Sequence, residues 1–264
     1  MSGFSLEWLN LREAADLQAR DRGLLQAAMQ WLQTMDTPII VDLGSGSGST
    51  LRALEQAGLH KALWRLVDND GKLLDAALQR HLGKWMLEDY QADLSIVNEL
   101  PLGGAALVTA SALFDLASEQ FMEQLARRLP EGCALYSALN YNGVMSWSAQ
   151  HPFDAQVVSA FNRDQQRNKG MGGPALGPQA VAFLRTLLEG SGFSVEVAES
   201  PWKIEGQSQR QLLLALVEGI AEAVSNTLPA EEVAEWHRFR QQHVDNDSCY
   251  VGHLDLLALP AEIA

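Results

Sequence analysis

Three closely spaced glycines after a short apolar run constrain this fold more than any other feature of the sequence. The run 39–43 is followed by Gly44, Gly46 and Gly48, and then by Ser49. Because glycine has no Cβ atom, its backbone can take positive φ values and let a ligand lie against the chain. Ser49 can satisfy one of the free N–H groups of a following helix. The pattern predicts a buried strand that turns sharply into a helix, which is an arrangement that binds nucleotides.

The spacing of these glycines narrows the class of nucleotide. A loop that binds a nucleoside triphosphate requires Gly-x-x-x-x-Gly-Lys-Ser/Thr, and the absence of a lysine after these glycines argues against ATP and GTP. A dinucleotide turn requires Gly-x-Gly-x-x-Gly, and here the third glycine arrives one residue early, with Ser49 in its place. The spacing therefore disfavours NAD without excluding it.

The acidic residue Asp42 completes the pattern Asp/Glu-x-Gly-x-Gly-x-Gly, which resembles motif I of the class I S-adenosylmethionine-dependent methyltransferases. The wider pattern also resembles a group of uncharacterised bacterial small-molecule methyltransferase-like proteins. The segments that carry this resemblance are 66–70, 111–113, the loop 162–178 and 251–253. The resemblance implies S-adenosylmethionine as cofactor and S-adenosylhomocysteine as product, and it names no substrate. It implies that the cofactor contacts Asp42, Gly44, Ser45, Gly46 and Gly48.

A second apolar run, 62–67, ends in Asp68 and Asn69 about 20 residues after the glycine turn, as nucleoside binding requires. We expect Asp68 to accept the two ribose hydroxyls and Asn69 to lie beside it. NAD enzymes share such a carboxylate, and a solvated turn residue is the alternative. By the family resemblance, Asp93 and Leu94 lie beside the adenine, although an exposed aspartate would explain Asp93 equally well.

A buried strand over 105–111 runs into polar residues where a doubly wound sheet opens its ligand cleft. By the same resemblance, Thr109 and Ser111 flank the methionine part of the cofactor, and Phe114 and Asp115 face the substrate. The alternative for Ser111 and Asp115 is a helix cap.

The fold class predicted is α/β, a Rossmann-like doubly wound sheet of seven strands in a single domain, 1–264. We expect a fifth strand over 133–139 that breaks at Asn140, and a helical insertion over 207–242 between strands six and seven. The predicted parts are a helical leader over 1–36, a cofactor-binding core over 37–140, a long substrate loop over 141–178, and the C-terminal half of the sheet over 179–264.

The loop over 141–178 is rich in polar and aromatic residues, and long insertions of this kind commonly form substrate pockets. A surface crossover is the alternative. We expect an acidic small molecule as the acceptor, with Asp115, Tyr141 and His151 as candidate catalytic residues and His253 as a weaker candidate base. The candidate substrate-binding residues are Phe114, Trp147, Asn162, Arg163, Gln165, Lys169 and His253.

The helical leader carries Trp8, Arg12 and Arg20. In many small-molecule methyltransferases a leader closes over the cofactor, so by resemblance these side chains could line the site. An amphipathic packing helix explains them equally well.

Composition limits the partners of the protein. The net charge of −14 disfavours nucleic acid. The two cysteines, Cys133 and Cys249, show no metal-binding spacing, so we expect no metal and a cytoplasmic location. No run is apolar and long enough for a membrane span, and the start of the chain does not read as a signal peptide.

The predicted activity is methyl transfer to a small molecule by in-line SN2 displacement, in which the site holds the nucleophile in line with the S–CH3 bond and excludes water. The alternatives are an NAD(P)-dependent oxidoreductase and a catalytically inactive cofactor-binding regulator. The oligomeric state stays open.

Overall fold

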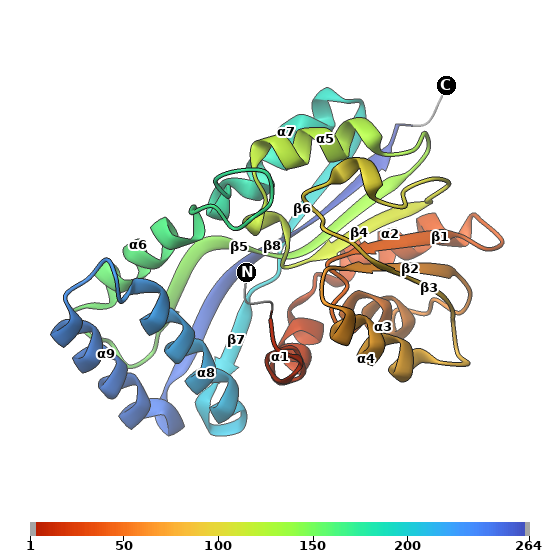
Figure 1. Ribbon diagram of the computed structural model, residues 1–264. Coiled ribbons are helices and arrows are strands. Elements are labelled where there is room, and N and C mark those ends of the chain that lie inside the picture. The colour runs from red at the N-terminus through yellow and green to blue at the C-terminus, as the bar shows by residue number, and fades with distance from the viewer. Residues whose placement is uncertain (1–3, 262–264) are drawn as a thin grey trace.

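A single mixed sheet organises the computed structural model, which describes residues 4–261 (Figure 1). Its strand order is β3-β2-β1-β4-β5-β8-β6, and β7 also pairs with β8. The first five strands are parallel, whereas β8 is antiparallel to β5, β6 and β7. The strands are β1 (Ile39–Leu43), β2 (Leu63–Asp68), β3 (Met86–Gln91), β4 (Leu107–Ser111), β5 (Ala134–Trp147), β6 (Phe193–Glu199), β7 (Trp202–Glu205) and β8 (Ser248–Pro260).

Helices cover both faces of the inner half of this sheet (Figure 1). Side chains of α5 (Glu119–Arg128) and α7 (Ala180–Gly190) pack on one face. Side chains of α2 (Arg22–Gln33), α3 (Ser49–Gln56) and α4 (Gly71–His81) pack on the other. The arrangement is the doubly wound α/β architecture expected from the sequence. The described chain also has four 3-10 turns: η1 (Val97–Glu99), η2 (Phe114–Leu116) and η3 (Gly177–Gln179), and η4 (Val244–Asn246), which belongs to the outer half of the sheet.

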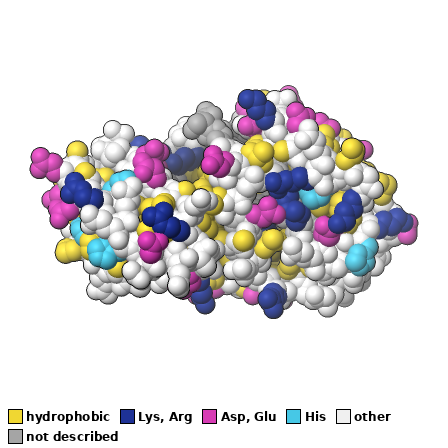
Figure 2. Space-filling view, turned by 90° about the horizontal axis from the view of Figure 1, so that it is seen from below, with side chains coloured by type: hydrophobic (Ala, Val, Ile, Leu, Met, Phe, Trp, Pro, Cys, Tyr) yellow, Lys and Arg dark blue, Asp and Glu magenta, His cyan; other side chains and the backbone are white. Residues whose placement is uncertain are grey.

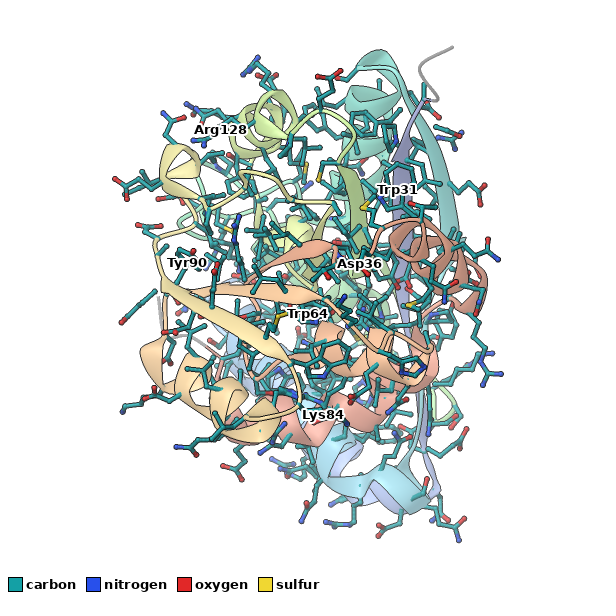
Figure 3. The ribbon with its side chains drawn as sticks, turned by 90° about the vertical axis from the view of Figure 1, so that its right-hand side faces the viewer. Trp31, Asp36, Trp64, Lys84, Tyr90 and Arg128 are labelled. Carbon is teal, nitrogen blue, oxygen red and sulfur yellow. The ribbon has the colours of Figure 1, made fainter. Side chains whose placement is uncertain are left out.

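The central strands β1 and β4 are mainly apolar because both of their faces are buried, and their polar residues lie toward their carboxyl ends. Ile40 and Leu107 belong to the core on the α2, α3 and α4 side, whereas Val41 and Val108 belong to the core on the opposite side. Figure 3 shows the same division near the β3 edge, with Trp64 on the side of α3 and α4 and Tyr90 on the other side of the sheet. Trp64 is fully buried, and its ring packs edge-on against Trp85 at 6.4 Å.

The sheet has eight strands, so the expected number of seven was wrong by one. β6 pairs with residues 254–260 of β8, and β7 pairs with residues 248–251 of the same strand. Ser200 and Pro201 separate β6 from β7. Proline has no N–H to donate to a ladder, so the edge of the sheet is interrupted and then resumes as a separate strand.

The fifth strand does not break at Asn140 as expected but continues to Trp147. Its pairing with β8 shifts register between Ser137 and Asn140, and Leu139 takes a positive φ of 57° there. These irregularities bend the strand without ending it. The segment 141–178, expected as a loop, therefore contains the outer half of β5 and the helix α6 (Asp154–Gln165) as well as the loop 166–176.

The outer halves of β5 and β8, together with β7, carry a second hydrophobic core. Its helices are α1 (Leu6–Ala19), α6, α8 (Gly206–Val224) and α9 (Ala230–His243), and α8 and α9 form the helical insertion expected between the last strands. No helix within residues 4–261 has the length and apolar character needed to cross a membrane.

Candidate functional site

The glycine turn lies between β1 and α3, at the carboxyl ends of the parallel strands. All three glycines have positive φ: 62° at Gly44, 53° at Gly46 and 87° at Gly48. Gly48 is the N-cap of α3, and no side chain in the described part of the chain accepts a hydrogen bond at this cap. The free N–H groups at the start of α3 therefore stay available to a ligand.

Asp68 ends β2 beside this turn. Its Oδ2 accepts a hydrogen bond from the backbone N–H of Gly46 at 2.8 Å, and its Oδ1 accepts one from the backbone N–H of Asp70 at 3.0 Å. Burial raises the pKa of the Asp68 carboxyl, and these backbone N–H groups oppose the rise. Each carboxylate oxygen keeps a lone pair for a further donor. This geometry suits a pair of ligand hydroxyls.

Asn69, expected beside Asp68, and Asp93 and Leu94, expected near the adenine, follow the ends of β2 and β3. Asn69 is exposed, and its carbonyl accepts from Gln91. Asp93 is exposed, and its Oδ1 accepts from the N–H of Ser95 at 2.9 Å. Leu94 is half-buried and packs against the core.

Near the carboxyl ends of β1 and β4 lies a group of buried polar atoms without hydrogen-bond partners among the described residues. Asp42 is 1% exposed and lies opposite Thr109 in the sheet register, and neither its two carboxylate oxygens nor the Thr109 hydroxyl has a partner. Burial raises the pKa of Asp42 to about 7. Ser45 and Thr50 carry further unpartnered hydroxyls. Such groups are costly unless a ligand or water satisfies them.

The leader brings a cation to this group. Arg20, the C-cap of α1, is 3% exposed and donates through Nη2 to Ser111 Oγ at 2.9 Å and to Ser49 Oγ at 3.4 Å. Its Nε and Nη1 are buried without a partner among residues 4–261. The charge of Arg20 opposes the rise in the Asp42 pKa. Because Ser111 ends β4 and Asp42 lies near the end of the neighbouring strand β1, this edge of the sheet holds a buried cation and a buried carboxyl, each with polar atoms that have no partner among the described residues.

Other contacts hold α1 over the turn. A Cβ atom built on Gly46 would lie 3.0 Å from Leu9 Cδ1. The Glu13 carboxylate accepts from Arg52 at 2.5 Å and from Arg80 at 3.3 Å, which ties α1 to α3 and α4. The leader therefore forms one wall of the site, a role that the sequence left open.

A second group of residues lies next to the first, around η2 and the outer half of β5. Asp115 is 7% exposed, its Oδ1 has no partner in the described chain, and burial raises its pKa to about 6. Tyr141 and His253 are register partners on β5 and β8, with ring centroids 6.3 Å apart. Burial and then the Arg12 charge lower the pKa of His253 to about 3, so its ring is neutral near pH 7.

Backbone strain marks the boundary between the two groups. Ala112, just after β4, has a φ of 50°, and Leu139 lies in the positive-φ region of β5. Non-glycine residues rarely adopt such values, and they cluster at functional sites. Sequence patterns carry no signal for either residue.

Two expected substrate residues and the expected catalytic residue His151 do not join these groups. Phe114 is fully buried in the core, where its ring lies 6.5 Å from that of Phe121. Trp147 packs on Trp236 in the outer core. His151 lies just before α6, where its Nδ1 accepts from the Phe153 N–H. Apolar and aromatic residues resemble one another in sequence whether they pack in a core or line a pocket.

The remaining expected residues come from α6 and the following loop. Arg163 is exposed and donates to Ser159 on the same helix, and Gln165 is half-buried near Gly177. Asn162 accepts from the Tyr141 hydroxyl at 2.8 Å. Lys169 pairs with Asp164 at 2.9 Å. No cluster of three or more His, Cys, Asp or Glu in the described chain could hold a metal ion.

Substituting Gly46 by alanine is expected to destabilise the protein by roughly 1–2 kcal/mol, because a residue with a Cβ is strained at this φ and would press on Leu9. Urea unfolding measures the effect. Gly190→Ala at the end of α7 is the control, because a Cβ at that position would meet nothing within 4 Å and its φ is not positive. Equal stability of the two variants would contradict this account of the turn.

Comparison with known proteins supports the fold assignment. No protein-family model and no curated protein matches this sequence. The solved YcgJ protein of Bacillus subtilis matches with a TM-score of 0.52 at 12% identity, over 92% of this chain and 100% of that chain. A SAM-dependent methyltransferase from Geobacter sulfurreducens, solved with S-adenosyl-L-homocysteine, matches with a TM-score of 0.50 at 17% identity, over 97% and 99%. At these identities the likeness shows a shared fold.

Proposed function

We propose that this chain, which has the fold of the class I S-adenosylmethionine-dependent methyltransferases, binds S-adenosylmethionine and catalyses methyl transfer to a small molecule. The antiparallel β8 between β5 and β6 separates this sheet from the strand order 3-2-1-4-5-6 of dinucleotide-binding domains. The sheet topology therefore favours methyl transfer over an NAD(P)-dependent oxidoreductase.

The observation that carries the proposal is that a cation, Arg20, and a carboxyl, Asp42, are both buried at this edge of the sheet with polar atoms that have no partner among the described residues. The methionine end of the cofactor is a zwitterion, with an α-carboxylate and an α-ammonium group. Arg20 offers buried N–H donors for the carboxylate, and Asp42 offers two buried carboxylate oxygens for the ammonium group. A nicotinamide has no such pair of charges. The Thr109 and Ser111 hydroxyls lie at the same strand ends and complete the proposed contacts with the methionine part.

The adenosine part fits the other end of the turn. We assign the ribose hydroxyls to Asp68, which holds its carboxylate beside the Gly46 N–H. The residues assigned to the adenine are Asn69, Asp93 and Leu94, from the ends of β2 and β3. Gly44, Ser45, Gly46 and Gly48 supply a backbone without side-chain bulk between the two ends.

S-adenosylmethionine supplies an electrophilic methyl group when it is bound, so the protein mainly has to hold a nucleophile in line and exclude water. Asp115 is the residue proposed to accept the proton of the acceptor, because its carboxyl is buried, has a free oxygen and has a pKa near the working pH. Tyr141 is the residue proposed to orient the acceptor, because its hydroxyl donates its proton to Asn162 and its oxygen can still accept a hydrogen bond. His151 takes no part in this proposal, because its Nδ1 accepts from the Phe153 N–H and its ring packs on Phe239.

A small-molecule acceptor in the cytoplasm agrees with the charges and cysteines of the chain. On the face seen in Figure 2, Lys and Arg side chains lie among Asp and Glu side chains and form no continuous basic patch. The net charge of −14 opposes binding to nucleic acid. Both cysteines are buried and unpaired, as is usual in a reducing compartment.

Calorimetric titration with S-adenosylhomocysteine, S-adenosylmethionine and NADH tests the cofactor. We expect both S-adenosyl compounds to bind, and Asp68→Ala to weaken binding about 100-fold, because it removes two charged hydrogen bonds. The control is Asp75→Ala, which removes an exposed carboxylate on α4. Binding of NADH alone would overturn the proposal. Binding of S-adenosylmethionine without transfer to any acceptor would favour a regulator over an enzyme.

A further inference from the structure

The leader changes direction between Arg20 and Asp21, where α1 ends and α2 begins. The N–H of Arg20 donates to the Asp16 carbonyl at 3.2 Å, on the side of α1. Asp21 Oδ1 accepts from the N–H of Leu24 at 2.8 Å, on the side of α2. A third bond ties this junction to the sheet, because the N–H of Asp21 donates to Oδ2 of Asp255 on β8 at 3.0 Å. Asp255 therefore holds the backbone from which the Arg20 side chain extends.

The same carboxylate holds a strained bend in β5. Its Oδ1 accepts from the N–H of Leu139 at 2.8 Å, and Leu139 is the residue with a positive φ of 57°. The hydroxyl of Tyr136 donates to Oδ2 at 3.2 Å. Asp255 is fully buried, so its three donors replace the water that would bind an exposed carboxylate. One side chain thus joins the leader, β5 and β8.

The bend in turn holds the end of β4. The carbonyl of Ala138 in the bend accepts from the N–H of Ala112 at 2.8 Å. Ala112 follows Ser111, whose Oγ accepts from Arg20 Nη2 at 2.9 Å. Both partners of this last hydrogen bond are therefore connected to Asp255, the donor through the leader and the acceptor through the bend.

Asp255 acts on the backbone beside Arg20 and leaves the guanidinium free for a ligand. Nε and Nη1 of Arg20 are buried without a partner among residues 4–261, and Nη2 donates to Ser111 and Ser49. A side chain as long as arginine loses much conformational freedom when it is held in one direction. Holding it at both its base and its tip before a ligand arrives reduces the cost that ligand binding would otherwise carry.

We propose that Asp255 is a positioning residue for the cofactor, which holds Arg20 where the guanidinium meets the α-carboxylate of S-adenosylmethionine. The inference rests on the proposed function, which assigns that carboxylate to Arg20. Asp255 itself touches neither cofactor nor acceptor and acts through the leader and β5. Loss of its carboxylate should therefore weaken binding of the amino-acid end of the ligand and spare the adenosine end. A change that only disordered the site would weaken both ends.

Calorimetry with S-adenosylhomocysteine and with methylthioadenosine, which lacks the amino-acid end, tests this role. We expect Asp255→Asn to weaken S-adenosylhomocysteine binding at least 10-fold and methylthioadenosine binding less than 3-fold, because the NH2 group of asparagine cannot accept a hydrogen bond. In an Arg20→Gln background, Asp255→Asn should change S-adenosylhomocysteine affinity less than 3-fold, because residues that act through one another are not additive. The control is Asp247→Asn, whose buried carboxylate also accepts from a backbone N–H, that of Ala149 at 2.8 Å, but in the outer half. It should leave both affinities within 3-fold.

A second pair of variants breaks the same contact from the leader and leaves Asp255 unchanged. Asp21 has a φ of −65° and Arg20 has a ψ of 134°, so proline fits at position 21 and removes the N–H. Asp21→Ala is the matched control, because it loses the same side chain and keeps the N–H. We expect S-adenosylhomocysteine to bind at least 5-fold more weakly to Asp21→Pro than to Asp21→Ala, and methylthioadenosine to bind both variants within 3-fold.

Equal losses for the two ligands in Asp255→Asn would overturn the inference. It would also be overturned by a full further loss in the Arg20→Gln background, or by equal S-adenosylhomocysteine affinities of Asp21→Pro and Asp21→Ala. If Asp255→Asn does not fold, the pair of Asp21 variants decides by itself. Absence of S-adenosylhomocysteine binding to the unsubstituted protein would instead overturn the proposed function.

Discussion

Replacing Asp42 with asparagine is expected to stabilise the free protein and at the same time to weaken S-adenosylhomocysteine binding. The unfolded chain loses the Asp42 proton near pH 4, whereas burial raises the pKa in the folded chain to about 7. The folded chain therefore binds more protons between these values, so stability falls as the pH rises through this interval. Asparagine does not ionise, so the variant avoids this loss of unfolding free energy, which amounts to about 4 kcal/mol at pH 8.

Urea unfolding at pH 5 and pH 8 measures the first effect, and we expect the advantage of Asp42→Asn to be larger at pH 8. The affinity for S-adenosylhomocysteine should instead rise as the pH rises, because the ionised Asp42 carboxyl is the form that pairs with the ammonium group. In the unsubstituted protein we expect S-adenosylhomocysteine affinity to fall up to about 10-fold per pH unit below pH 7.

A matched ligand isolates the amino-acid end of the cofactor. Methylthioadenosine keeps the adenosine and the thioether but lacks the zwitterion, so its binding should change little in Asp42→Asn. Arg20→Gln should likewise weaken S-adenosylhomocysteine and spare methylthioadenosine. Equal losses for both ligands would show that these residues act on the fold of the site and not on the zwitterion.

Replacing Arg240 with methionine is expected to destabilise the protein by about 3–5 kcal/mol, because it leaves the buried Asp247 carboxylate and the partly buried Asp154 carboxylate without their cation. Arg240 is 2% exposed and donates to Asp247 at 2.9 Å, to the Ala149 carbonyl at 2.5 Å and to Asp154. Its guanidinium also lies 4.4 Å from the centre of the Trp147 ring. These contacts join α9 to the outer end of β5 and to the start of α6.

The midpoint and slope of urea unfolding measure this effect. Arg238→Met is the control on the same helix, because Arg238 is exposed. The triple variant with Asp154→Asn and Asp247→Asn should recover part of the loss, since it removes the unpaired charges. A loss below about 1 kcal/mol in Arg240→Met would contradict the assigned role. We expect little change in S-adenosylhomocysteine affinity, because Arg240 contacts none of the residues of the glycine turn.

Local patterns predicted the inner half of the molecule well. A strand buried on both faces is a continuous apolar run, and a strand that turns into a helix over a ligand needs glycines with positive φ. Both signals lie within a dozen residues of Gly44, so they can be read directly. The helical insertion over α8 and α9 was predicted for the same reason, because a helix repeats its apolar side chains over short intervals.

The outer half was predicted less well, because its strands depend on partners far away in the chain. Asn140 and Gly143 are poor strand residues, and they read as a turn. β5 nevertheless continues through them, because β8 lies alongside it and supplies backbone partners more than 100 residues later. Trp147 and Phe114 were interpreted as substrate residues for a related reason, since only packing separates a core aromatic from a pocket aromatic.

The sequence by itself determined where the inner strands and helices follow one another along the chain, and it determined the glycine turn and the carboxylate at the end of β2. These features depend on steric and hydrogen-bonding preferences of residues that are neighbours in the chain. Only the tertiary structure decided that Arg20 of the leader donates to Ser111 at the end of β4, and that Arg12 lies over the Trp202 ring, which in turn lies beside His253. Such pairs are separated by up to about 190 residues, and burial in a shared site, which no local pattern encodes, is what leaves polar atoms of Arg20 and His253 free for a ligand.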